Sequence, residues 1–147
     1  MLAPKHLLRL ACIALLVLLS TAASTQSPRQ TPIPEDPSGV PADYQRQLQV
    51  NPQSSLTHYQ IAEVLFAQHR YQASANACRV ALRGDGYPSW TKVWSHIQLG
   101  EIFDVTGQRD RAVTEYKLAL KTEDDTRGAL DKARRLLQEP FGSSEPR

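Results

Sequence analysis

The sequence predicts an all-α fold, and three observations lead to that prediction. From about residue 43 to residue 140 the apolar side chains recur at helical spacing, and no stretch alternates in the way of a strand. Two segments of this region align with each other without a gap. Glycine or proline follows most of the apolar runs, where helices are expected to end. Antiparallel helical hairpins that stack on one another, closed by a further helix at the C-terminal end, account for all three observations.

The composition agrees with a single folded domain. The chain has 147 residues, of which 41% are hydrophobic and 22% are charged, so enough apolar surface is present for a packed core. Apart from Lys5 and Arg9, basic and acidic side chains balance at 15 each. Nucleic-acid binding depends on an excess of basic side chains, so we expect no nucleic-acid partner.

Residues 1–24 are typical of a secretory signal peptide. The start of this segment is basic, residues 10–19 are apolar throughout, and small side chains follow them. We expect cleavage after Ala23 or Ser24 and no membrane span afterwards, with the mature protein in the periplasm or cell envelope, or secreted. The alternative is an uncleaved anchor helix, for which the apolar run is short.

The two segments that flank the helical region are predicted to be disordered. Residues 25–42 hold five prolines and few large apolar side chains, and proline removes a backbone donor and fixes φ. This stretch is predicted to be a Pro-rich linker. Residues 141–147 are short and polar, and they are predicted to be a disordered tail. The helical domain therefore spans residues 43–140.

A short helix is expected over residues 43–50, followed by the internal repeat. Placing residues 56–83 over residues 94–121 gives a shift of 38. Identical residues then coincide at four places: His58 with His96, Gln60 with Gln98, Glu63 with Glu101, and Ala81-Leu82 with Ala119-Leu120. Each segment predicts two helices, so the repeats cover about residues 55–84 and about residues 89–122.

The turn inside each repeat is expected at equivalent positions. Gly107 ends the first helix of the second repeat, and His69 stands at the matching position of the first. Both residue types accept the left-handed backbone that commonly ends a helix. Small residues recur where two helix axes must approach closely, and larger side chains fill the space between them.

A capping helix is expected over about residues 126–138. Its apolar stripe is formed by Ala129, Leu130, Ala133, Leu136 and Leu137. Charged side chains, Lys132 among them, are expected on the outer face, and Pro140 ends the helix. This helix would cover the apolar face that the second repeat leaves open.

The repeat resembles the tetratricopeptide repeat (TPR), a helix-turn-helix unit of about 34 residues. In the second copy the matching residues are Leu99, Gly100, Phe103, Gly107, Ala112, Tyr116 and Ala119. In the first copy they are Ile61, Ala62, Leu65, Ser74 and Ala81. The first copy departs from the family pattern with His69 in place of glycine and Cys78 in place of an aromatic residue. The resemblance covers about half of the chain and implies a short α-solenoid with a C-terminal capping helix.

The resemblance also implies a function. In this family the first helices of successive repeats line a concave groove that binds a peptide or a segment of another protein. The matching positions here are Tyr59, Glu63, Phe66, Trp94, Ile97, Glu101 and Asp104. Aromatic anchors together with carboxylates would suit a partner with apolar side chains and a basic group. We therefore expect an exported, non-catalytic scaffold or adaptor for protein–protein interaction, with no cofactor.

Two other functions remain open from the sequence. One is a small metal-binding protein or a metal-dependent enzyme that uses His58 and His96, which share a register on neighbouring helices. The other is a purely structural repeat module that self-associates. The sequence contains none of the common motifs of hydrolases, metalloproteases or phosphate-binding loops, so we expect no enzymatic activity. Cys78, the one cysteine after the signal peptide, is expected to be a buried apolar residue, and the sequence leaves its reactivity open.

Overall fold

The structure is a computed structural model in which residues 39–143 are described, and these residues are all-α. In chain order the helices are α1 (Ala42–Val50), α2 (Ser55–Ala67), α3 (Tyr71–Arg83), α4 (Trp90–Val105), α5 (Arg109–Leu120), the 3-10 helix η1 (Thr126–Gly128) and α6 (Ala129–Gln138). Residues 39–143 contain no strand, so the predicted fold class is confirmed. The predicted signal peptide, the linker up to residue 38 and the tail from residue 144 lie outside the described residues.

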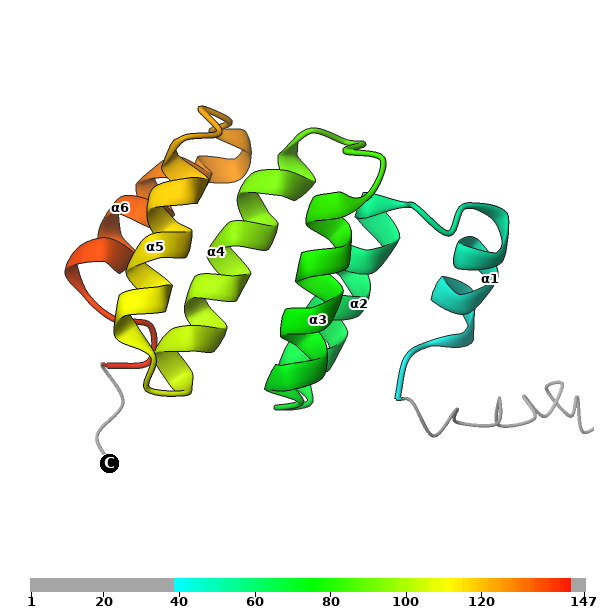
Figure 1. Ribbon diagram of the computed structural model, residues 1–147, viewed down its shortest axis with the longest axis horizontal. Coiled ribbons are helices and arrows are strands. Elements are labelled where there is room, and N and C mark those ends of the chain that lie inside the picture. The colour runs from blue at the N-terminus through cyan, green and yellow to red at the C-terminus, as the bar shows by residue number, and fades with distance from the viewer. Residues whose placement is uncertain (1–38, 144–147) are drawn as a thin grey trace, which may run out of the picture. The chain divides into compact units, whose positions relative to one another are not determined.

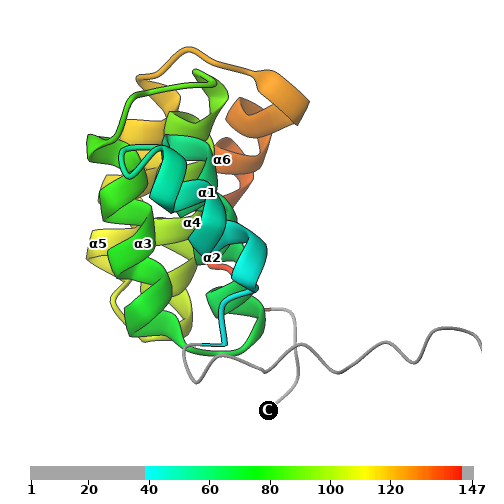
Figure 2. The same cartoon turned by 90° about the vertical axis from the view of Figure 1, so that its right-hand side faces the viewer.

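Two helical hairpins form the centre of the fold. The first consists of α2 and α3 and the second of α4 and α5, and their bounds agree with the two predicted repeats. The hairpins pack on each other mainly through α3 and α4, and α2 also contacts α4. In Figure 1, α3 and α5 lie toward the viewer, and Figure 2 shows α2 and α6 on the opposite side, with α4 between. Successive helix pairs that pack side by side in this way are the arrangement of a helical repeat solenoid.

The turns inside the two hairpins have the same geometry. His69 and Gly107 both have a left-handed backbone, with φ of 59° and 74°. The following N–H groups donate five residues back, from Arg70 to the Leu65 carbonyl at 2.9 Å and from Gln108 to the Phe103 carbonyl at 2.7 Å. This pattern satisfies helix-end carbonyls that would otherwise have no partner. The prediction that His69 can replace glycine at this turn is therefore confirmed.

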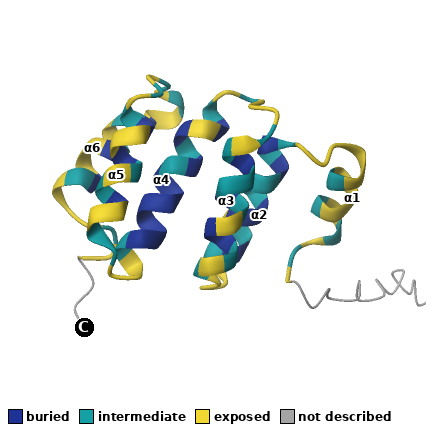
Figure 3. Cartoon of the chain, in the orientation of Figure 1, coloured by how far each residue is buried: buried dark blue, intermediate teal, exposed yellow. Residues whose placement is uncertain are grey.

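Helix α4 lies at the centre of the core and carries more buried residues than any other described helix. In Figure 3 much of α4 has the dark blue colour of buried residues. Cys78 on α3 is fully buried and free, as expected. Burial raises the pKa of its thiol above the ordinary value, so the reactive thiolate is disfavoured.

Helix α6 covers the second hairpin as predicted. It packs on α5 and also contacts α4, and its buried residues are Ala129, Ala133 and Leu136. At the other end, α1 has no buried residue and joins the fold through contacts such as Thr57 Oγ1 donating to Gln47 Oε1 at 3.1 Å. The C-terminal end of the stack is thus covered by a helix with buried residues, whereas α1 at the other end contributes none.

The prediction that the disordered tail begins at residue 141 was wrong. Phe141 packs against the core, and its ring lies 5.9 Å from that of Phe66, measured between centroids. Its backbone N–H also donates to Asp104 Oδ2 at 2.9 Å. The composition of residues 141–147 did not indicate this attachment, because the segment is otherwise short and polar. Phe141 therefore belongs to the helical domain.

Candidate binding pocket

A pocket of about 240 Å³ lies among the inner helices α2, α4 and α6. Its walls are Tyr59, Glu63 and Phe66 from α2, Trp94, Gln98 and Glu101 from α4, and Lys132 from α6. Five of these seven residues are among the groove positions named from the sequence. The positions fall together because they are three, four or seven residues apart on each helix and so share one face.

The α2 wall presents a carboxylate that is held in place yet open to solvent. Tyr59 is 6% exposed, and its hydroxyl donates to Glu63 Oε1 at 2.9 Å. The ring of Tyr59 meets Trp90 edge to face, with centroids 5.7 Å apart. Burial and the neighbouring Glu63 carboxylate raise the pKa of Tyr59, so the hydroxyl stays a donor. Glu63 itself is exposed and makes no ion pair among the described residues.

The opposite wall joins a buried acid to an ammonium group. The Glu101 side chain is 9% exposed, and its Oε1 lies 2.6 Å from Lys132 Nζ. The same Nζ lies 5.2 Å from the centroid of the Trp94 ring, within the range of a cation–π contact. The Trp94 indole is fixed in turn, because its Nε1 donates to the Thr126 carbonyl at 3.1 Å. Burial raises the pKa of Glu101, and the Lys132 ammonium opposes that rise without cancelling it.

Sequence reasoning missed two residues of the pocket. Gln98 is 6% exposed, and its Oε1 has no hydrogen-bond partner among the described residues. The repeat alignment held a signal for it, because Gln60 is its counterpart in the first hairpin. Lys132 was placed on the outer face of the last helix, and this placement was wrong. Its long side chain turns inward to Glu101 and leaves only 32% of its surface exposed.

Two of the predicted groove residues do not line the pocket. Ile97 is fully buried within the core. Asp104 lies seven residues further along α4, so the two share a stripe beside the pocket face. The Asp104 side chain is 0% exposed and is bound by Arg109 and Tyr116 of α5. Both assignments to the groove are therefore corrected.

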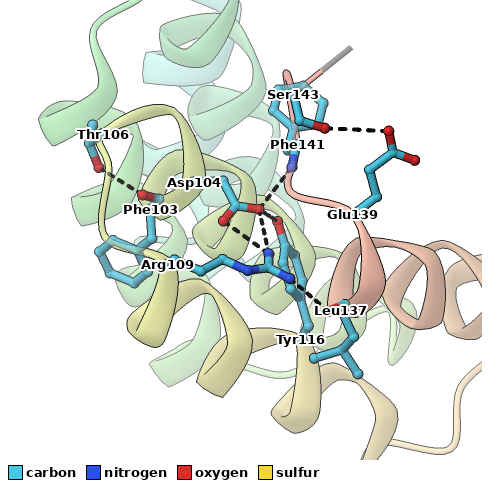
Figure 4. Close-up of polar contacts among 9 residues, drawn as sticks. All are labelled: Phe103, Asp104, Thr106, Arg109, Tyr116, Leu137, Glu139, Phe141 and Ser143. Atoms are coloured by element: carbon cyan, nitrogen blue, oxygen red, sulfur yellow. Dashed lines mark hydrogen bonds and ion pairs between the residues drawn. The ribbon is translucent and has the colours of Figure 1, made fainter.

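The Asp104 carboxylate organises a buried polar cluster, shown in Figure 4. Its Oδ2 accepts hydrogen bonds from the Tyr116 hydroxyl at 2.8 Å, from Arg109 Nη1 at 3.0 Å and from the Phe141 N–H at 2.9 Å. Arg109 also donates through Nη2 to the Leu137 carbonyl at 2.7 Å. These contacts connect α4, α5 and the end of α6, so the role of Asp104 is structural.

The two repeat histidines make different contacts. His96 Nδ1 lies 2.8 Å from Glu115 Oε2, whereas His58 Nε2 lies 3.0 Å from the Pro52 carbonyl oxygen. Among residues 39–143, no three His, Cys, Asp or Glu side chains lie close enough together to hold a metal ion.

Comparisons with known proteins do not assign a family. The chain matches no model of a known protein family, and no curated protein matches it. None of the helices described for this chain combines the length and the hydropathy needed to cross a membrane.

The buried acid predicts a pH dependence of stability. The pKa of Glu101 is raised in the folded state, so its contribution is largest below the ordinary glutamate pKa of about 4.3 and is lost as the pH rises through the folded value. We expect the free energy of unfolding, relative to that of Glu101→Gln, to fall between pH 4 and pH 7. Lys132→Met should enlarge the fall, because the ammonium lowers this pKa. Urea unfolding of the three proteins at both pH values tests this, and equal pH profiles for wild type and Glu101→Gln would contradict it.

Proposed function

We propose that the protein is a non-catalytic, TPR-like scaffold that is exported and binds a segment of another protein in the pocket among α2, α4 and α6. The partner segment carries a lysine side chain flanked by apolar side chains. The single observation that carries this proposal is the composition of the pocket, where two carboxylates stand among aromatic rings on the inner helices of stacked hairpins. The family resemblance supports the scaffold role. The basic and apolar start of the sequence supports export.

The size of the pocket favours a side chain over a free metabolite. Its volume of about 240 Å³ lies below the roughly 300–1,000 Å³ that is usual for small-molecule sites. A single long side chain that enters from a docked segment requires less room. Phe66 and Trp94 are half-buried and offer apolar surface beside that entry.

The charge of the pocket favours a basic side chain. Glu63 is exposed, oriented by Tyr59 and free of an ion pair among the described residues, so a cation can reach it without breaking an existing pair. Glu101 adds a second carboxylate that is costly to leave ionised without a neighbouring cation. An acidic partner would face both carboxylates, and like-charge contacts oppose binding.

Binding of short peptides tests the proposal. The probes are three capped seven-residue peptides with two leucines around a central lysine, glutamine or glutamate, titrated into the protein by calorimetry. We expect the lysine peptide to bind best. Trp94→Ala should weaken its binding about tenfold or more, as expected for an aromatic anchor. Glu63→Gln should reduce the preference for lysine over glutamine about fivefold, in line with a partly exposed charge pair.

Matched controls lie outside the pocket. Tyr87→Ala removes an aromatic side chain that is 76% exposed, and Glu123→Gln removes an exposed carboxylate. Both variants should bind the lysine peptide as the wild type does. The proposal is wrong if the three peptides bind equally, or if Trp94→Ala and Tyr87→Ala have the same effect.

A further inference from the structure

The pocket already contains an ammonium group of the chain itself. Lys132 Nζ lies 2.6 Å from Glu101 Oε1 and 5.2 Å from the centroid of the Trp94 ring. A carboxylate on one side and an aromatic face on the other are the contacts that a lysine of a partner would use. We propose that Lys132 is an internal occupant of the lysine subsite, which competes with the partner's lysine and sets the affinity of the pocket. This inference rests on the proposed function.

The environment of Lys132 allows it to leave. Its side chain is 32% exposed, so it is not enclosed by the pocket on all sides. Helix α6 is held by other contacts, namely Arg109 to the Leu137 carbonyl and the Phe141 N–H to Asp104. The Lys132 side chain can therefore swing out to solvent while the helix stays in place.

The incoming lysine has one contact that Lys132 lacks. Glu63 stands on the α2 wall, and the ion pair of Lys132 is with Glu101. A partner's ammonium that enters from the solvent side can lie between the two carboxylates, which compensates for the release of Lys132. Gln98 contributes a buried Oε1 that has no hydrogen-bond partner among residues 39–143, and it lies in the same wall as Glu101. The subsite is thus more fully satisfied by a partner's lysine than by the internal one.

The expected effect follows from population arithmetic. If the state with Lys132 outside the pocket is populated about 10% of the time, the apparent affinity of a competing lysine falls about tenfold. Removing the ammonium removes that competition. Lys132→Met keeps a side chain of similar length, and we expect it to bind the central-lysine peptide about tenfold more tightly than the wild type does.

The matched control removes the same charge from the same helix. Arg134 forms an exposed ion pair with Asp131, and neither residue lines the pocket. Arg134→Met should bind the peptide like the wild type, which separates local competition from a change in net charge. A gain shared by both variants would overturn the inference in favour of general electrostatics.

A second measurement uses the wild-type protein and does not depend on a variant. In the free protein the Lys132 Hε protons should be shifted upfield by the ring of Trp94, and saturation with the central-lysine peptide should return them to ordinary values. The inference is overturned if this shift persists in the complex, or if Lys132→Met binds no more tightly than wild type while Trp94→Ala still weakens binding about tenfold or more. The proposed function survives that result, and it fails instead if no binding depends on Trp94 in either background.

Discussion

Replacing Asp104 with alanine is expected to lower the free energy of unfolding by roughly 2–4 kcal/mol. The Asp104 side chain is fully buried, and it accepts hydrogen bonds from Tyr116, from Arg109 and from the backbone N–H of Phe141 (Figure 4). Removing the acceptor leaves the Tyr116 hydroxyl and the Phe141 N–H without a partner at a site where water cannot easily replace it. Arg109 is 32% exposed and can turn to solvent, which keeps the expected loss below that of a fully buried ion pair.

Urea unfolding measures this loss, and a second carboxylate provides the control. Asp131 pairs with Arg134 at 2.6 Å, but the two side chains are 75% and 58% exposed. Asp131→Ala should therefore cost less than about 1 kcal/mol. Asp104→Ala should also release the C-terminal segment, seen as faster proteolysis after residue 138. Similar losses for the two variants would show that the buried cluster does not connect the helices as described.

The repeat carried most of the fold prediction. The gapless alignment of two segments predicted four helices, and the equivalence of His69 and Gly107 predicted both turns at the positions where the structure has them. These features are local, since they depend on helical periodicity and on which residues accept a positive φ. The attachment of Phe141 was not predictable in this way, because its partners Phe66 and Asp104 lie far away in the sequence.

The candidate site was only partly predictable for a related reason. A shared helix face brought Tyr59, Glu63 and Phe66 together with Trp94 and Glu101, and helical spacing is sufficient to find such a face. Spacing alone did not show that the adjacent stripe with Ile97 and Asp104 is covered by other helices. The inward turn of Lys132 depends on packing of α6 against the second hairpin and on the flexibility of a long side chain.

Replacing Gly100 with alanine is expected to destabilise the fold by about 2–3 kcal/mol, although alanine is the better helix former. A Cβ at position 100 would lie 2.2 Å from Cε1 of Tyr116 and 2.7 Å from two further ring atoms. The ring cannot move away easily, because Tyr116 is fully buried and its hydroxyl is held by Asp104 at 2.8 Å. Overlap with a fixed ring therefore outweighs the gain in helix propensity.

The first hairpin suggests a second substitution that should relieve the overlap caused by Gly100→Ala. The repeat alignment places Ala62 on Gly100 and Cys78 on Tyr116, so the first hairpin combines a larger residue with a smaller one at the same two positions. Both Ala62 and Cys78 are fully buried. In a Tyr116→Cys background, Gly100→Ala should cost nothing or become stabilising, and the double-mutant cycle should show a coupling of about 2 kcal/mol.

A glycine elsewhere separates overlap from backbone effects. Gly107 has a φ of 74° but open space where a Cβ would stand, so Gly107→Ala should cost only about 1 kcal/mol through backbone strain. That cost should be the same in the Tyr116→Cys background, since no side chain is involved. If Gly100→Ala cost as much without the Tyr116 ring as with it, close packing of glycine against tyrosine would not explain why position 100 is small in the second hairpin. Close packing would then also fail to explain why a small residue at one of the two equivalent positions is paired with a larger one at the other in each repeat.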